Sequence, residues 1–253
     1  MNAFKEALAR RVPRIGLWQA LANPYTAEIC ARAGFDWLLF DGEHAPNDLQ
    51  TMLAQLQAVA PFAAEPVVRP RNDDPALIKQ YLDMGFRSLL VPMIDSGEQA
   101  RRLVAATRFP PHGVRGVASA TSRASGFGTN RSYLGSAHED ICVIAQIESR
   151  AALAAIEDIA ATDGIDALFI GPGDLAGALG HLGDPMHADV QAAIAEAIDR
   201  IAAAGKPGGI FALSSEDAQR RLADGVAMVS VGTDIGLLVS GARALRQSLP
   251  VSG

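Results

Sequence analysis

Ile144-Ala-Gln-Ile-Glu148 and Phe169-Ile-Gly-Pro-Gly-Asp174 each place a carboxylate just after a short apolar run. Both runs are rich in Ile, Leu or Phe and are followed by helical patterns, which is typical of buried parallel strands that alternate with helices. Glu148 and Asp174 would then project from neighbouring strands toward one rim. Two such oxygen ligands suit Mg²⁺ or Mn²⁺, which keeps other positions for water and substrate. The alternative is that each carboxylate is a helix cap or an ion-pair partner.

The same alternation of apolar runs and helical patterns extends along the whole chain. Eight runs predict strands: Ile15–Trp18, Trp37–Phe40, Pro66–Val68, Ser88–Val91, Cys142–Ile147, Ala167–Ile170, Gly208–Phe211 and Met228–Val231. Apolar residues at helical spacing lie between most of them: Pro24–Ala33, Leu49–Ala60, Pro75–Met84, Ser96–Thr107, Arg150–Ala161, Ala188–Ala204 and Ser215–Ala223. Eight strand–helix units predict an α/β fold of the TIM (β/α)₈ barrel type.

The connections support this prediction and mark two exceptions. Glycine follows five of the helical patterns where a helix should end, at Gly34, Gly85, Gly164, Gly205 and Gly225. Phe109–Glu139 has no clear helix or strand and is too long for an ordinary connection, so we expect a functional or interface insert. Ile235–Ser248 predicts an amphipathic helix whose apolar residues need a surface to cover, and that surface would belong to a neighbouring subunit. Residues 1–253 are thus predicted to form one barrel domain, with 235–253 as its C-terminal helix and tail.

Composition limits the classes of function. A chain of 253 residues with 49% hydrophobic content can bury one core of barrel size. A net charge of −6 and an estimated pI of 5.4 argue against a nucleic-acid partner, which generally needs a clustered basic face. The chain has no signal-peptide pattern at its start and no run long enough to span a membrane, so a cytoplasmic location is expected. Cys30 and Cys142 have apolar neighbours and are expected to be buried free thiols.

Polar residues follow most of the predicted strands, at the end of such a barrel where catalytic residues gather. They are Asp41-Gly-Glu-His44, Arg69-Pro-Arg71, Gln146 with Glu148, Gly171-Pro-Gly-Asp174 and Gly232-Thr-Asp234. His44 opens a loop, and its ordinary pKa of about 6.5 suits proton transfer at neutral pH, although a helix cap is the alternative. Arg69 follows two valines, and its guanidinium would neutralise an enolate or grip a carboxylate.

Two other residues are noted for different reasons. Asp83, on pattern alone, is an i,i+4 partner for Lys79 on a helix. His181 lies inside Gly180-His-Leu-Gly183 and is the histidine that stands out from the remaining ones, which occur in loop-like sequence and are expected to be exposed: His112, His138 and His187.

Six motifs in order resemble the HpcH/HpaI aldolases, from about Gly16 to Leu238. They are Trp37-Leu-Leu-Phe-Asp-Gly-Glu-His-Ala-Pro46, Val67-Val-Arg-Pro70, Leu89-Leu-Val-Pro92, Gln146-Ile-Glu148, Phe169-Ile-Gly-Pro-Gly-Asp174 and Gly180-His-Leu-Gly-Asp-Pro185. The chain looks most like the 4-hydroxy-2-oxoheptanedioate aldolase type. This resemblance implies a class II pyruvate aldolase of aromatic-compound catabolism, which cleaves carbon–carbon bonds with the help of Mg²⁺, Mn²⁺ or Co²⁺.

The resemblance also implies roles for individual residues. Glu148 and Asp174 would bind the metal, while Gln146 and the backbone around Gly173, with Asp174, would position the 2-oxoacid. The metal would act as a Lewis acid on the bound 2-oxoacid, and Arg69 would stabilise the enolate oxygen. His44 would be the base, directly or through a metal-bound water, with Asp83 raising its basicity. The family also forms hexamers, trimers of dimers that exchange C-terminal helices.

Two departures from the family pattern bear on specificity. Gly126-Phe127-Gly128 stands where bulkier or polar residues are usual, so this loop would admit different aldehydes. Gly173 replaces a frequent Ala, which would widen the 2-oxoacid pocket by roughly a methyl group and admit hydroxypyruvate beside pyruvate.

Three alternatives to this mechanism differ in what they require. A Schiff-base aldolase needs a lysine at a strand end, whereas the only lysines, Lys5, Lys79 and Lys206, lie elsewhere. An acyl-CoA lyase of the citryl-CoA lyase type needs a basic groove, for which the long loop offers Arg115, Arg123 and Arg131. A non-catalytic barrel that binds a 2-oxoacid would need no His44.

Overall fold

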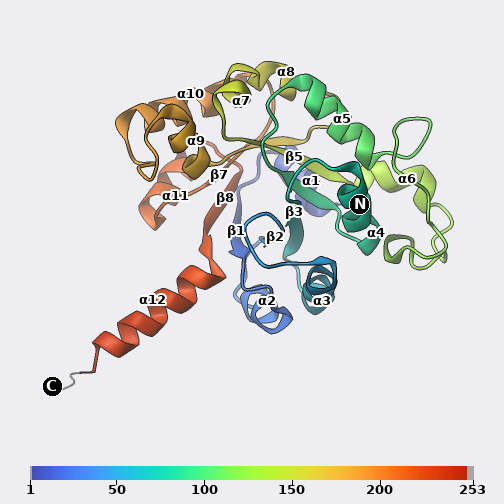
Figure 1. Ribbon diagram of the computed structural model, residues 1–253, viewed down its shortest axis with the longest axis horizontal. Helices are drawn as coiled ribbons and strands as arrows, with labels where there is room; N and C mark the ends of the chain where they lie inside the picture. Colours follow the sequence, from blue (N-terminus) through green and yellow to red (C-terminus); the bar gives the residue numbers. More distant parts are fainter. Residues whose placement is uncertain (1, 250–253) are drawn as a thin grey trace.

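Eight parallel strands close into a barrel in the computed structural model, which describes residues 2–249 (Figure 1). Each strand pairs with its neighbour in the chain, and β1 also pairs with β8. The strands are β1 (Arg14–Gln19), β2 (Trp37–Asp41), β3 (Glu65–Arg69), β4 (Ser88–Val91), β5 (Cys142–Ile147), β6 (Ala167–Ile170), β7 (Gly208–Phe211) and β8 (Met228–Thr233). The predicted TIM-type barrel is confirmed, and every predicted strand lies within the observed one or coincides with it.

Helices surround the barrel and alternate with its strands (Figure 1). They are α2 (Pro24–Ala31), α3 (Leu49–Val59), α4 (Pro75–Met84), α5 (Gly97–Thr107), α7 (Arg150–Ala154), α8 (Ile156–Ala160), α10 (Ala188–Ala203) and α11 (Ser215–Ala223), followed by α12 (Asp234–Gln247). The five glycines expected to end helices all have the positive φ of a left-handed turn. The single helix predicted over residues 150–161 is instead two short helices that meet at Ala155.

Three helices and one short turn were not predicted from the pattern: α1 (Ala3–Ala9), α6 (Tyr133–Asp140), α9 (Pro172–Leu179) and the 3₁₀ turn η1 (Arg123–Ser125). The expectation that Phe109–Glu139 contains no helix is therefore wrong at its end. Ala137 is the one buried residue of α6, so this helix has almost no apolar periodicity to detect. In α9, Pro172 and Gly173 conceal a helix that begins with proline in its first turn, a position where proline fits well.

The barrel interior is filled by side chains from alternate strand positions, which sets where the polar residues point. Trp37, Leu39, Val67 and Phe169 belong to this inner cluster, and their neighbours along the strands pack outward against the helices. Two positions beyond Leu39 and Val67 lie Asp41 and Arg69, at partner positions of β2 and β3. The alternation therefore directs both polar side chains inward at the barrel mouth.

Two features at the periphery matter below. At the amino end of the barrel, α1 covers the interior, and Phe4 packs on Trp37 with ring centroids 6.3 Å apart. At the other end of the chain, α12 leaves the barrel and extends away from it (Figure 1). Its apolar side chains are exposed: Ile235, Leu237, Leu238, Val239 and Leu245. The last residues of the predicted tail, 250–253, lie outside the described part of the chain.

Two further observations concern the helices and the cysteines of the described residues. No helix within residues 2–249 combines the length and apolar character that crossing a membrane requires. Cys142 is buried and Cys30 is half-buried, and both thiols are free.

Candidate active site

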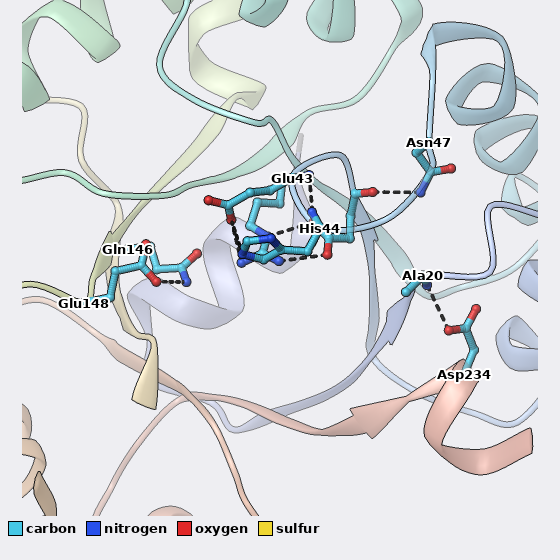
Figure 2. A network of polar contacts seen from close by, with 9 residues as sticks. Ala20, Glu43, His44, Asn47, Gln146, Glu148 and Asp234 are labelled. Atoms are coloured by element: carbon cyan, nitrogen blue, oxygen red, sulfur yellow. Dashed lines mark hydrogen bonds and ion pairs between the residues drawn. The ribbon is translucent and has the colours of Figure 1, made fainter. Parts of the chain in front are cut away.

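Glu148 follows β5 and is held almost fully buried at the barrel mouth. Its Oε1 accepts a hydrogen bond from the backbone N–H of Met93 at 2.9 Å. Its Oε2 accepts one from the Gln146 amide at 2.5 Å, which Figure 2 shows. Burial raises the pKa of Glu148 to about 7; the Met93 hydrogen bond opposes this effect, and the negative charges of Asp174 and Glu43 add to it. This carboxylate is thus fixed in place with neutral donors and without a cation of its own.

Asp174 lies beside Glu148 because β6 ends at Ile170 and Gly171 leads directly into α9. A side chain at Gly171 would collide with the Glu148 carboxylate, so only glycine allows the two strand ends to approach this closely. Asp174 occupies the first turn of α9, where the positive end of the helix dipole favours a negative charge. Gly173 is exposed beside it, and a Cβ there would meet no atom within 4 Å.

Arg69 is buried and engages two carboxylates at once. Its Nε and Nη2 donate to the two oxygens of Asp41 at 2.9 and 2.8 Å, and its Nη1 lies 2.8 Å from Oε2 of Glu43. The guanidinium also lies over the Trp18 ring, 4.2 Å from its centroid. A two-pronged ion pair and an aromatic face leave this cation little freedom, so it is oriented before any substrate arrives.

His44 lies at the outer side of the same mouth and remains 64% exposed. Its backbone N–H points to Asp41 Oδ1 at 3.4 Å, and its ring Nε2 lies 3.8 Å from Oε2 of Glu43. Figure 2 shows Glu43 and His44 on one side and Gln146 with Glu148 on the other. An accessible imidazole here is suited to proton transfer to a molecule that enters from solvent.

The acids of this mouth outnumber its bases, which is the property that fits a cation. Asp41 and Glu43 share the guanidinium of Arg69, and Glu148 and Asp174 have no ion pair in the described residues. Burial raises the pKa of Glu43, although Arg69 and His44 counteract it. A divalent ion held by Glu148 and Asp174 would offset this surplus of negative charge with the oxygen ligands that Mg²⁺ and Mn²⁺ prefer. The Gln146 Oε1 is buried with no hydrogen-bond partner among the described residues, which leaves an acceptor for a bound molecule.

Asp83, in contrast, is not brought to His44 within one chain. It lies in the last turn of α4, whereas His44 follows the carboxyl end of β2. Since helices of such a barrel run opposite to its strands, these residues lie at opposite ends of the molecule. The Asp83 carboxylate instead accepts a hydrogen bond of 2.6 Å from the buried guanidinium of Arg115, in the long loop.

Comparison with known proteins agrees with this geometry. The model of the family described as HpcH/HpaI aldolase/citrate lyase matches residues 14–241. The chain belongs to this family. The resemblance drawn from the sequence motifs is thereby confirmed, and the HpcH/HpaI match includes all of the rim residues described above.

Named relatives share about half of their residues with this HpcH/HpaI chain. It is 55% identical to a hydroxypyruvate/pyruvate aldolase of Deinococcus radiodurans, over 98% of the chain and 89% of the relative. It is 53% identical to a 4-hydroxy-2-oxo-heptane-1,7-dioate aldolase of Salmonella heidelberg, over 96% and 93%. Among solved structures, a family protein of Burkholderia cenocepacia is 41% identical, covers 98% of this chain and 99% of its own, and has a TM-score of 0.95.

Sequence reasoning gave no role to three groups that the HpcH/HpaI fold places at the mouth. Asp41 orients Arg69, and its position directly opposite Arg69 in the register of neighbouring strands was a signal that could have identified it. Trp18 ends the inner face of β1 and was hidden among ordinary apolar residues. Met93 has a positive φ of 55°, rare for a residue with a side chain, and no sequence pattern predicts that its N–H fixes Glu148.

Proposed function

We propose that this protein is a divalent-metal-dependent aldolase that reversibly cleaves 4-hydroxy-2-oxoacids to pyruvate or hydroxypyruvate and an aldehyde. The observation that carries the proposal is the buried Glu148 beside Asp174, facing an oriented Arg69 and an accessible His44 at one end of the barrel. Membership of the HpcH/HpaI family and the names of the relatives support the same reaction class.

Glu148 and Asp174 are the residues that would hold the metal. Once bound, a Mg²⁺, Mn²⁺ or Co²⁺ ion supplies Lewis acidity, which makes the C3 protons of a 2-oxoacid easier to remove. The hydrogen bonds from Met93 and Gln146 keep the Glu148 carboxylate in one orientation for this role. Residues that contact a metal ligand, and not the metal, also commonly affect the affinity for the metal.

Arg69, Gln146 and the Gly173 backbone would position the 2-oxoacid. Three of the five N–H donors of Arg69 are committed to Asp41 and Glu43, so further donors remain for an enolate oxygen. The open space at Gly173 supports a pocket that also admits the extra hydroxyl of hydroxypyruvate.

His44 would move the proton. In the cleavage direction, it accepts the proton of the 4-hydroxyl group while the C3–C4 bond breaks, the aldehyde leaves, and the bonding electrons remain on the 2-oxoacid as an enolate. Return of the proton to C3 then yields pyruvate, so the step balances without a further reactant. The exposure of His44 is consistent with an aldehyde that enters and leaves from the solvent side.

Asp83 would contribute to this chemistry only by acting on His44 of another copy of the chain. Asp83 lies at the opposite end of the barrel from His44 of the same chain, so the predicted effect of Asp83 on the basicity of His44 would act between subunits. The exposed apolar residues of α12 support assembly, since such a surface is normally covered. We therefore retain the predicted hexamer with exchanged C-terminal helices as part of the proposal.

The structure disfavours the rival enzymatic readings. Two of the arginines that a CoA groove would need are committed to the chain itself, since Arg115 is buried against Asp83 and Arg123 donates to the Met84 carbonyl. For a Schiff base, Lys5 and Lys206 are unsuitable, because both donate to backbone carbonyls next to the amino ends of β5 and β6.

The test is release of pyruvate from 4-hydroxy-2-oxoheptanedioate by chelator-stripped protein, with and without Mg²⁺, Mn²⁺ or Co²⁺. We expect metal to restore activity to the wild type and to Glu157→Gln, an exposed carboxylate on α8, but not to Glu148→Ala or Asp174→Ala. The reverse reaction is run with pyruvate and with hydroxypyruvate. Activity that survives chelation would overturn the proposal, whereas turnover of a CoA ester alone would support the lyase reading and ligand binding without any turnover the binding-protein reading.

A further inference from the structure

The loop between α9 and α10 gathers two imidazoles and a carboxylate that the proposed reaction does not use. The rings of His181 and His187 are stacked, with centroids 3.6 Å apart and planes 15° from parallel. Asp189 Oδ2 lies 3.2 Å from Nε2 of His181 and 3.7 Å from Nδ1 of His187. One potential ligand atom from each residue thus lies within 4.8 Å of the other two.

The chain is folded tightly to bring these residues together. His181 follows the C-cap of α9, and Gly180 and Gly183 have positive φ angles of 93° and 81°, which reverse the chain direction. Backbone hydrogen bonds from Asp184 to His181 and from His187 to Asp184 close two successive turns. His187 then caps α10, whose first turn carries Asp189.

Two of the three ligand separations are close to those of a metal site. Ligands at about 2.0–2.1 Å from a tetrahedral ion lie about 3.3 Å from one another, close to the two separations around Asp189 Oδ2. We propose that His181, His187 and Asp189 form a second metal site, which takes a transition metal such as Zn²⁺, Co²⁺ or Ni²⁺. Two imidazole nitrogens favour these ions over Mg²⁺, which prefers an all-oxygen set.

Metal binding would rearrange the side chains of this cluster and leave the turns that carry them in place. The Nδ1 of His187 accepts the Asp189 N–H at 3.2 Å, so its lone pair points at the first turn of α10 and would exchange this hydrogen bond for the metal. Because a metal lies in the plane of each imidazole that binds it, one of the two stacked rings would rotate out of the stack so that both nitrogens reach the same ion. Asp189 is 73% exposed, which leaves room for water as a fourth ligand.

The site would also join two elements around the catalytic residues. Asp174 is in the first turn of α9, and the proposed ligands link the end of α9 to the start of α10. An ion there would therefore restrain the helix that carries a catalytic carboxylate. It would also add a second binding event to any titration with Co²⁺, although the proposal itself does not depend on the aldolase activity.

The experiment isolates this site by removing the other one. Untagged, chelator-stripped Glu148→Gln/Asp174→Asn protein is titrated with Co²⁺, and the visible absorption and the binding heat are recorded. We expect one Co²⁺ per chain with nitrogen-ligand absorption bands. Adding His181→Gln or His187→Asn should weaken binding at least about tenfold, since even loss of an outer partner of a ligand costs 10–100-fold. His138→Gln on α6 is the matched histidine control and should change nothing.

His187→Asn is chosen because asparagine can still cap α10, so a folding defect would not imitate loss of the ligand. Circular dichroism and thermal melts without metal check this directly. The proposal is overturned if the Glu148→Gln/Asp174→Asn protein binds no Co²⁺, or if its binding is equally strong in both histidine variants.

Discussion

The two ends of the barrel balance their charges differently. At the amino end, three carboxylates have a cation each: Glu65 lies 3.0 Å from Arg87, Asp36 lies 2.9 Å from Arg14, and Asp166 lies 3.2 Å from Lys5. At the carboxyl end, Asp41 and Glu43 share Arg69, while Glu148 has only neutral hydrogen-bond donors.

This difference separates residues that hold the fold from residues that await a ligand. A paired charge at a strand end is offset within the chain by its own cation, even where burial raises the pKa of the carboxylate. An unpaired buried carboxylate costs folding free energy, and such a group persists at functional sites because a bound partner offsets the cost. Both ends of the barrel contain carboxylates, but only at the carboxyl end do carboxylates outnumber the cations that pair with them. This surplus therefore identifies the carboxyl end as the active one.

The largest expected effect of breaking this contrast is at Arg69. Arg69→Lys keeps the charge but loses the planar fork that bonds Asp41 through two nitrogens. Loss of an oriented donor for the enolate should lower kcat about 10²–10³-fold in the metal-supplemented aldolase assay.

Arg87→Lys is the matched control at the amino end, because Arg87 also binds a carboxylate but lies far from the mouth. It should retain kcat and KM close to those of the wild type. Equal losses in the two lysine variants would mean that Arg69 acts on stability and not on the reaction.

The barrel and the placement of the rim residues were easier to predict from the sequence than the contacts of those residues. Strand periodicity and helix-ending glycines were sufficient for the barrel, and residues after strands were sufficient to bring Arg69, Glu148 and Asp174 to one rim. Asp83 shows the limit, since a helix-end residue faces the opposite rim and its partner, Arg115, comes from a loop that has no periodicity. The backbone of Met93 and the aromatic face of Trp18 depend on packing between strands, which one strand's sequence does not encode.

A smaller effect is expected when the orientation of Arg69 is loosened from its aromatic side. Trp18 lies under the guanidinium and packs edge-on against Phe211, with ring centroids 5.3 Å apart. Trp18→Leu removes the ring face and should lower kcat/KM by about tenfold, equivalent to about 1.4 kcal/mol. Trp18→Phe retains a π face, so its activity should lie between those of Trp18→Leu and the wild type. If both variants lose the same activity, the volume of Trp18 matters and its ring face does not.

The smallest effect is expected at the balanced end, where Glu65→Gln should alter the pH dependence of stability and leave catalysis unchanged. Burial raises the pKa of Glu65, with Arg87 and the Ser88 hydroxyl acting against this effect. The stability that this group contributes is thus fully present below its unfolded pKa of about 4.5 and is lost as pH rises through the higher folded value. Glutamine cannot ionise, so in urea unfolding the variant should gain stability relative to the wild type as the pH rises above the ordinary pKa of a glutamate. The lost pair with half-exposed Arg87 is worth about 1 kcal/mol at most, which keeps the net change small.

A stability difference between Glu65→Gln and the wild type that stays constant with pH, or any fall in kcat/KM, would contradict the view that the carboxylates at this end are paired for structure and take no part in catalysis.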